Sequence, residues 1–427
     1  MLIFLKLKTL FVQILNKFKD NNFLRFIYKY FFVLSFLFLS IPAYAQYLTL
    51  DSHIDIPFDY MDNPKHDPGN LTEMQVDFSK MEAGGLDSGF FIVYVGQSNL
   101  TDDGFKKAKD QAMLKFKAIH KMIQTYPDKI LLALEPNDVR NAKEKGKISA
   151  AIGIENGYII GNNINLLEDF YDLGARYITL SHIGHNQISD SSIPKKSLDD
   201  AFEMHGGLSS FGKEVISKMN QLGIMVDISH ISDKAALQAI KLSETPVIAS
   251  HSSARAIANH PRNLSDNIIK KIANKNGVIQ IVAFSSYIEI NKERNNAISS
   301  LRKFIVDLTG DKIFIFRKHT EHPQYKIKMD EINRDFPLPS IDKFINHVDY
   351  VVNLVGINHV GISSDFGGGG GIDGWMDASQ TKNITLALLE RGYSKNDIKK
   401  IWSENFLRVW TDATNYSKKK SKQNLSD

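Results

Sequence analysis

The chain has 427 residues, of which 43% are hydrophobic and 23% charged, and it contains no cysteine. These fractions are those of a globular protein, and the missing cysteine excludes disulfide bonds and a lipoprotein attachment site. The formal net charge is +4, but the first 45 residues contain six basic residues and one acid, so the remainder has a net charge of −1. Nothing in that balance favours nucleic acid as a partner.

The first 45 residues have the organisation of an export signal. Scattered lysines precede an apolar run from Phe31 to Ile41, and Ala43-Tyr44-Ala45 follows as a small-residue cleavage site. The eleven residues of the apolar run fall short of the ~20 that a spanning helix needs, which argues against a stable membrane anchor. The sequence therefore predicts a signal peptide over 1–45 and an exported protein, periplasmic or secreted, after cleavage near Ala45.

Downstream, short β-branched runs bounded by turn residues alternate with amphipathic segments. This alternation predicts right-handed βα units and a parallel sheet, because each helix returns the chain to the same edge. Eight such units close a barrel, so the predicted fold class is α/β, a (β/α)8 TIM barrel formed by residues 46–413. The predicted strands are 48–53, 89–95, 149–155, 176–182, 223–230, 246–251, 277–284 and 359–366.

Two segments depart from the repeat. Residues 285–340, after the seventh strand, are too long and too polar for a routine βα loop, and we expect a partly helical insertion over the mouth of the site. The stretch 414–427, with its lysine run, predicts a basic disordered tail. The glycines 367–371 lack the spacing of a phosphate loop and favour a flexible or tightly turned rim loop.

Chemically active side chains gather at the carboxyl ends of the predicted strands, which a parallel barrel brings to one face. Taken singly each has a structural explanation, such as an ion pair for Glu155 or a satisfied core histidine for His230. Together they provide nitrogen and oxygen ligands without sulfur, which suits zinc and leaves positions open for water. The candidate metal ligands are His53, Asp55, Glu155, His230 and His251.

Three further residues are candidates for other roles. His182 and Asp365 end the fourth and eighth predicted strands, and we interpret them as acid-base and oxyanion partners because the other five residues already satisfy two metals. Arg262 lies a short loop after the sixth strand, where a guanidinium can hold a carboxylate in a two-pronged geometry.

With these residues, the chain resembles the membrane (renal) dipeptidase family, the dinuclear zinc dipeptidases, over residues 48–410. It departs from the vertebrate pattern at Ser52, Ile54 and Gly367, which looks similar to a bacterial exported branch. The segments that support the resemblance are 51–57, 75–77, 155–157, 176–182, 227–230, 250–255, 261–264, 359–366 and 405–409.

The resemblance implies a role for each candidate. One zinc is bound by His53 and Asp55, the other by His230 and His251, and Glu155 bridges them, giving about two Zn²⁺ per chain. By the same resemblance His182 contacts the scissile carbonyl and stabilises the tetrahedral intermediate. Arg262 would hold the substrate carboxylate and Asp365 would move the proton of the attacking water.

The function expected is zinc-dependent hydrolysis of dipeptides with a free C-terminal carboxylate, with a C-terminal D-residue as one candidate class. The alternatives are hydrolysis of another amide or lactam, or an exported zinc- or peptide-binding protein without turnover. The expected partner is a small dipeptide substrate, and a homodimer is the candidate assembly.

Overall fold

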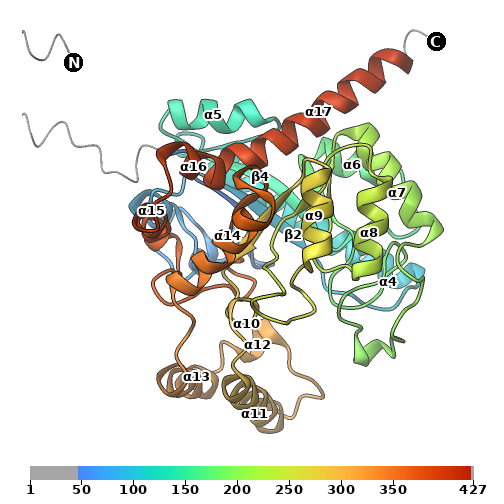
Figure 1. Cartoon of the computed structure of the whole chain (residues 1–427). Coiled ribbons are helices and arrows are strands. Elements are labelled where there is room, and N and C mark those ends of the chain that lie inside the picture. Colours follow the sequence, from blue (N-terminus) through green and yellow to red (C-terminus); the bar gives the residue numbers. More distant parts are fainter. Residues whose placement is uncertain (1–46, 425–427) are drawn as a thin grey trace, which may run out of the picture. The chain divides into compact units, whose positions relative to one another are not determined.

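The computed structural model describes residues 47–424, so the predicted signal peptide lies outside the described residues. Eight parallel strands follow one another in chain order around a barrel (Figure 1). The first and last strands meet where the Asp55 N–H donates to the Phe366 carbonyl at 2.7 Å. The predicted TIM barrel is therefore confirmed. Its strands are β1 (Leu50–Asp55), β2 (Ser88–Tyr94), β4 (Ile148–Glu155), β5 (Ala175–Thr179), β6 (Met225–Asp227), β7 (Ile248–Ala249), β8 (Val278–Val282) and β9 (Val360–Ser363).

The sequence prediction erred on one strand and on several strand ends. A ninth strand, β3 (Ile130–Leu132), pairs with β4 outside the barrel circuit and was missed because three residues are too short to show a pattern. The strands predicted over 176–182 and 246–251 stop earlier, at Thr179 and Ala249. The chain leaves the sheet before each histidine, so those histidines stand on loops above the barrel.

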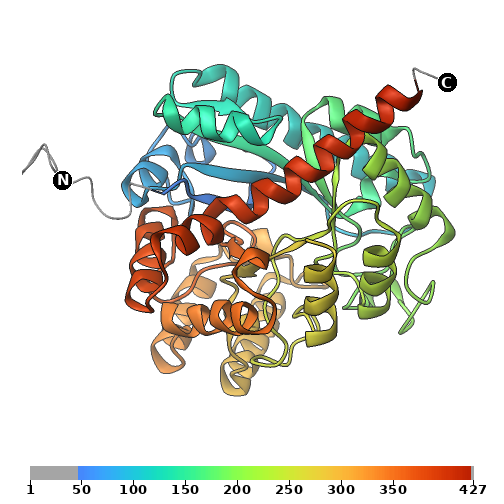
Figure 2. The same ribbon diagram turned by 45° about the horizontal axis from the view of Figure 1, so that its top comes forward.

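The C-terminal helix α17 (Asn405–Asn424) lies across one end of the barrel (Figure 2), where its apolar side chains pack against those that fill the barrel interior. The ring of Phe90 lies 5.1 Å from that of Phe406 and 5.4 Å from that of Trp410. Leu50 and Phe90 come early in their strands, so α17 closes the amino-terminal end. The carboxyl-terminal end is left for the site.

The outer helices pack a second apolar layer against the barrel, and several of them begin at side-chain caps. Thr101 accepts from Gly104 N at the start of α4, and Ser209 does the same for Gly212 N at α7. Such caps satisfy amide groups that lack a partner in the first turn. The helices of this layer are α3 (Phe78–Gly84), α4 (Asp102–Thr125), α5 (Pro136–Glu144), α6 (Leu166–Asp172), α7 (Ser210–Leu222), α8 (Asp233–Leu242), α9 (Asp266–Asn274), α14 (Ile341–Val355), α15 (Thr381–Glu390) and α16 (Lys395–Lys399).

The insertion after β8 is helical, as predicted, and projects from the barrel as a group (Figure 1). It has a small apolar core of its own, formed by Leu301, Ile305, Tyr325 and Ile332, which the sequence did not suggest. Residues 316, 320 and 321 line a cavity of about 550 Å³ that Asp55 and Gly367 also line, so the insertion reaches the rim of the site. Its helices are α10 (Ser285–Ile288), α11 (Lys292–Thr309), α12 (Phe316–His319) and α13 (Pro323–Asp335).

The disordered tail predicted from residue 414 is wrong for the part that the structure describes, because α17 continues to Asn424. The extension is attached to the body of the protein. The Ser417 hydroxyl donates to the Gln221 carbonyl at 2.7 Å, and Lys418 pairs with Glu135 at 2.7 Å. Among residues 47–424 no helix is both long enough and apolar enough to cross a membrane.

Candidate metal centre

The first strand delivers two ligand candidates to the barrel interior. Ile54 packs into the outer apolar layer, so alternation turns its neighbours His53 and Asp55 inward. Leu50 also points inward, although strict alternation along the strand would put it on the opposite face from His53. The register shift between Asp51 and Ile54 explains this, because an irregularity in the strand reverses which residues face inward. Both side chains are buried, as the sequence predicted for a site inside the barrel.

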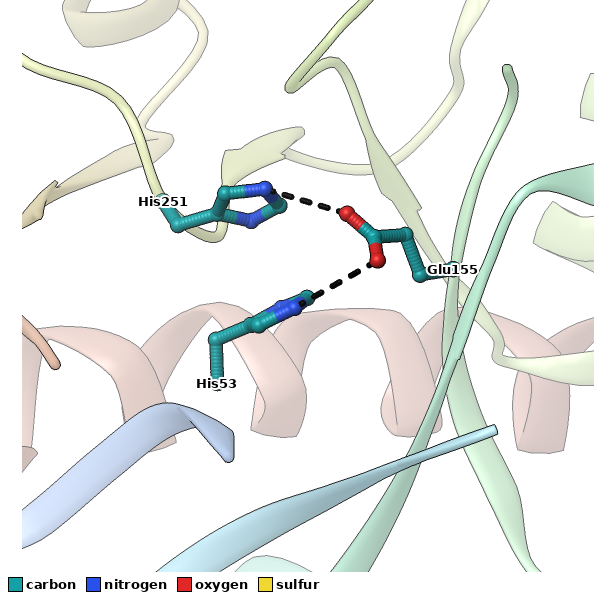
Figure 3. A group of neighbouring side chains, drawn as sticks. All are labelled: His53, Glu155 and His251. Atoms are coloured by element: carbon teal, nitrogen blue, oxygen red, sulfur yellow. Dashed lines mark ion pairs between the residues drawn. The ribbon is translucent and has the colours of Figure 1, made fainter. Parts of the chain in front are cut away.

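Glu155, the last residue of β4, directs its two carboxylate oxygens at two different imidazoles, those of His251 and His53 (Figure 3). Its Oε1 is 3.0 Å from Nε2 of His230 and 3.2 Å from Nε2 of His251. Its Oε2 is 3.7 Å from Nε2 of His53. The two oxygens of one carboxylate therefore face the two predicted ligand pairs, which is the arrangement that bridging requires.

The remaining candidates lie at the same centre. Asp55 Oδ2 is 3.5 Å from His53 Nε2, and these two residues group with Asp365. His182 Nε2 is 3.8 Å from Glu155 Oε1 and groups with Glu155 and His230. Distance alone would admit His182 and Asp365 as ligands, so their predicted non-ligand roles remain proposals.

The residues present fit a metal. Three imidazoles and three carboxylates are buried together, and buried carboxylates without a cation are costly. Nε2 of His53 has no hydrogen-bond partner among the described residues. Burial lowers the pKa of His251 to about 3, and burial with nearby Arg262 lowers the pKa of His230 well below its usual value. Neutral imidazoles with available lone pairs are the form that binds metal.

A hydrogen bond on the side of His53 that faces away from the centre determines which ring nitrogen carries the proton. The Tyr177 hydroxyl donates to the Ser52 carbonyl at 2.9 Å and lies 3.0 Å from His53 Nδ1. Because the single hydroxyl proton is already committed, Tyr177 must accept from Nδ1–H, so in the neutral ring that binds metal Nε2 carries the lone pair. Gly153 makes this possible, since a Cβ there would lie 2.4 Å from the Tyr177 ring.

A serine hydroxyl plays the corresponding part for His251. The Ser250 hydroxyl donates to Asp227 Oδ2 at 2.6 Å and is 2.8 Å from His251 Nδ1. It therefore accepts from Nδ1–H, and His251 also presents an unprotonated Nε2 to the centre. The sequence analysis missed Tyr177, Asp227 and Ser250, although all three lie on or just beyond barrel strands that lead to candidate site residues.

Arg262 is almost fully buried, with 2% of its surface exposed. Its Nη2 donates to the His251 carbonyl at 3.0 Å, and its guanidinium carbon lies 5.3 Å from the centre of the Tyr287 ring. These contacts place a fixed positive charge beside the candidate metal ligands. Nε of Arg262 has no hydrogen-bond partner within residues 47–424, so donor capacity remains for a ligand.

The glycine-rich segment after β9 is a tight turn packed against the carboxylates. Gly368 N and Gly370 N both donate to the Asp365 carbonyl, at 3.1 and 2.8 Å. A Cβ on Gly368 would lie 2.3 Å from Asp365 Oδ1 and 2.4 Å from Asp55 Oδ2. Of the two forms predicted for this rim loop, the tight turn is the one observed, and glycine is required by the close approach.

A buried cluster of imidazoles and carboxylates at the carboxyl end of a parallel barrel defines a barrel metallohydrolase. The sequence matches the model of the family described as "Membrane dipeptidase (Peptidase family M19)" over residues 43–424. The chain therefore belongs to this family, and it is a metallo-dipeptidase, as the motifs indicated.

Relatives agree with this assignment. The chain is 28% identical over 357 residues to dipeptidase tcpJ of Claviceps purpurea, covering 82% of this chain and 72% of the relative. Among solved structures, the probable dipeptidase PvdM from Pseudomonas aeruginosa superposes with a TM-score of 0.77 and 32% identity, covering 87% of this chain and 97% of that one. A metallopeptidase from Rhodobacter sphaeroides, liganded with a phosphinate mimic of L-Ala-D-Ala, shares the fold with a TM-score of 0.67 and 20% identity, covering 86% and 99%.

Proposed function

We propose that this protein hydrolyses dipeptides with a free C-terminal carboxylate, with zinc as its metal. His53 and Asp55 would hold one ion, His230 and His251 the other, and Glu155 both. The observation that carries the proposal is the position of Glu155, whose two oxygens face separate histidines at 3.0 to 3.7 Å. When bound, two zinc ions supply Lewis acidity and lower the pKa of a shared water toward about 7.

The protein's own residues orient the substrate and move the proton. The buried Arg262 guanidinium would bind the C-terminal carboxylate, which brings the peptide bond of a two-residue substrate over Glu155 and excludes longer chains. His182 would donate from Nε2 to the carbonyl oxygen as negative charge develops there. Asp365 would accept a proton from the attacking water and return it to the leaving amine.

The function is tested by metal analysis together with a dipeptide panel. Purified protein should contain about two zinc ions per chain by the ligand count. It should release amino acids from free dipeptides and lose that activity with a chelator, and added zinc should restore it. One tightly bound metal with full activity would contradict the bridging role of Glu155, and inactivity of the zinc-loaded protein on every dipeptide would contradict the proposed function.

Arg262→Lys tests carboxylate recognition. Lysine keeps the charge but not the two-pronged geometry, so we expect kcat/KM to fall by about 1.5 to 3 kcal/mol of transition-state stabilisation, the range for a charged hydrogen bond. Arg334→Lys, at an exposed position on α13, is the matched control and should behave as wild type. Equal cleavage of free and C-terminally amidated dipeptides by the wild-type protein would show that Arg262 does not bind the substrate carboxylate.

The same dipeptide panel should also compare L- and D-residues at the second position of the substrate. The Rhodobacter relative carries a mimic of L-Ala-D-Ala, which supports including dipeptides with a C-terminal D-residue. Hydrolysis of another amide or lactam is the second candidate, because the same activated water would attack either carbonyl. Export after cleavage near Ala45 remains a proposal, supported by the composition of the segment before Gln46.

A further inference from the structure

The barrel sheet ends at Glu155 on both sides of β4. Glu155 is the last residue of this strand that pairs with β2, and it is also the last that pairs with β5. The next residue, Asn156, has φ 80° and ψ 94°, a conformation that residues other than glycine rarely adopt. The carboxylate proposed to bridge two metals therefore stands at the end of the hydrogen-bonded ladder, beside a sharp change in chain direction.

The side chain of Asn156 continues the cross-strand connection beyond the end of the sheet. Asn156 is fully buried, and its Nδ2 donates to the Val95 carbonyl at 3.0 Å and to Gln97 Oε1 at 3.3 Å. Its Oδ1 accepts from Asn186 Nδ2 at 3.0 Å and from Tyr158 N at 3.3 Å. Both donors and both acceptor positions of the amide are used. One side chain thus joins the end of β4 to the segments that follow β2 and β5.

Backbone groups fix the direction of these hydrogen bonds. Asn186 Nδ2 donates to the Leu180 carbonyl at 2.8 Å, and its Oδ1 accepts from Ile188 N at 2.9 Å and Ser189 N at 3.0 Å. A carbonyl can only accept and an N–H can only donate, so the nitrogen of the Asn186 amide is the atom that faces Asn156 Oδ1. The two amides therefore have a single orientation, with Asn186 as the donor.

The same pair of amides connects two residues of the centre. Glu155 directly precedes Asn156, and His182 lies two residues after Leu180, whose carbonyl accepts from Asn186. Glu155 Oε1 and His182 Nε2 are 3.8 Å apart. A shift of either segment would change that distance, and a misplacement of about 1 Å can cost about 100-fold in rate.

We propose that Asn156 is a positioning residue that, together with Asn186, holds the Glu155 carboxylate between the two metal positions and at a fixed distance from His182. This inference rests on the proposed dipeptidase function. The position needs two properties that asparagine combines, tolerance of a positive φ and an amide that both donates and accepts. Its effect on the reaction would be exerted through Glu155.

Asn156→Gly tests the amide while sparing the backbone, because glycine adopts a positive φ readily. Residues that hold a metal ligand in place contribute about 10- to 100-fold to metal affinity or activity, so we expect losses of that size in zinc affinity and in kcat at saturating zinc. Chelator competition measures the zinc affinity without turnover. KM should stay unchanged, because Arg262, which would bind the substrate carboxylate, lies after β7 and outside this network.

The matched control is Asn220→Ala, which removes another buried asparagine amide, one that donates to Ser243 and Thr245 in the outer layer. It should lower the melting temperature and leave zinc affinity and kcat unchanged. If Asn156→Gly also lowers only the melting temperature, or raises KM with zinc affinity and kcat unchanged, Asn156 does not position the centre and the inference is wrong.

A double-mutant cycle tests the link to Asn186. Asn186→Ala should also weaken zinc binding, and the double variant should lose less than the product of the two single losses, because both changes remove the same hydrogen bond. Independent losses would contradict the link. If zinc affinity responds as expected but the wild-type protein hydrolyses no dipeptide, the proposed function fails and the positioning of Glu155 by Asn156 stands.

Discussion

Asp365→Asn is expected to abolish most turnover while leaving the metal content intact. The substitution keeps the size of the side chain and removes the base, and a positioned acid-base group contributes roughly 100- to 10,000-fold in rate. Asp365 is well placed for this role, because it is buried beside His53 and Asp55 at the carboxyl end of the last strand. Burial, with the charges of Asp55 and Glu155, also raises the pKa of Asp365 well above its usual value.

The measurement is kcat together with metal content and dipeptide affinity. Asp128→Asn, at an exposed position before β3, controls for the loss of a surface charge and should be silent. Loss of one metal from Asp365→Asn would make Asp365 a ligand, which its grouping with His53 and Asp55 would also permit. Unchanged turnover would remove Asp365 from the mechanism.

Glu155→Gln should lose both activity and metal. A neutral amide cannot share two anionic oxygens between ions, and the histidines would then face each other without the central charge, His230 Nε2 being 2.8 Å from His251 Nε2. We expect metal occupancy to fall below two ions per chain. Mutation of a residue that only hydrogen-bonds to a metal ligand costs roughly 10- to 100-fold in activity, and we expect a larger loss here.

Metal analysis and activity at saturating zinc separate the two effects. Glu214→Gln, at an exposed position on α7, is the matched control. A Glu155→Gln protein that retains two tightly bound ions and wild-type turnover would refute the bridging assignment.

The sequence predicted the barrel well because eight buried strands leave a local signal, a short apolar run with a polar residue at its end. It did not reveal β3, whose three residues pair outside the circuit. It also misjudged the C-terminus, since a lysine-rich segment gives no sign that Ser417 and Lys418 will meet partners on Gln221 and Glu135. Those contacts join residues far apart in the chain, and local composition carries no information on them.

The sequence by itself determined the family, the barrel and the set of residue types at the strand ends, because these follow from local pattern and spacing. Only the tertiary structure decided how each histidine is used. Tyr177 reaches His53 across the barrel because Gly153 leaves room for its ring, and Asp227 on another strand holds the Ser250 hydroxyl that faces His251 Nδ1. A tautomer depends on which atom lies within about 3 Å of a ring nitrogen, and that distance is set by packing between strands that the sequence places far apart.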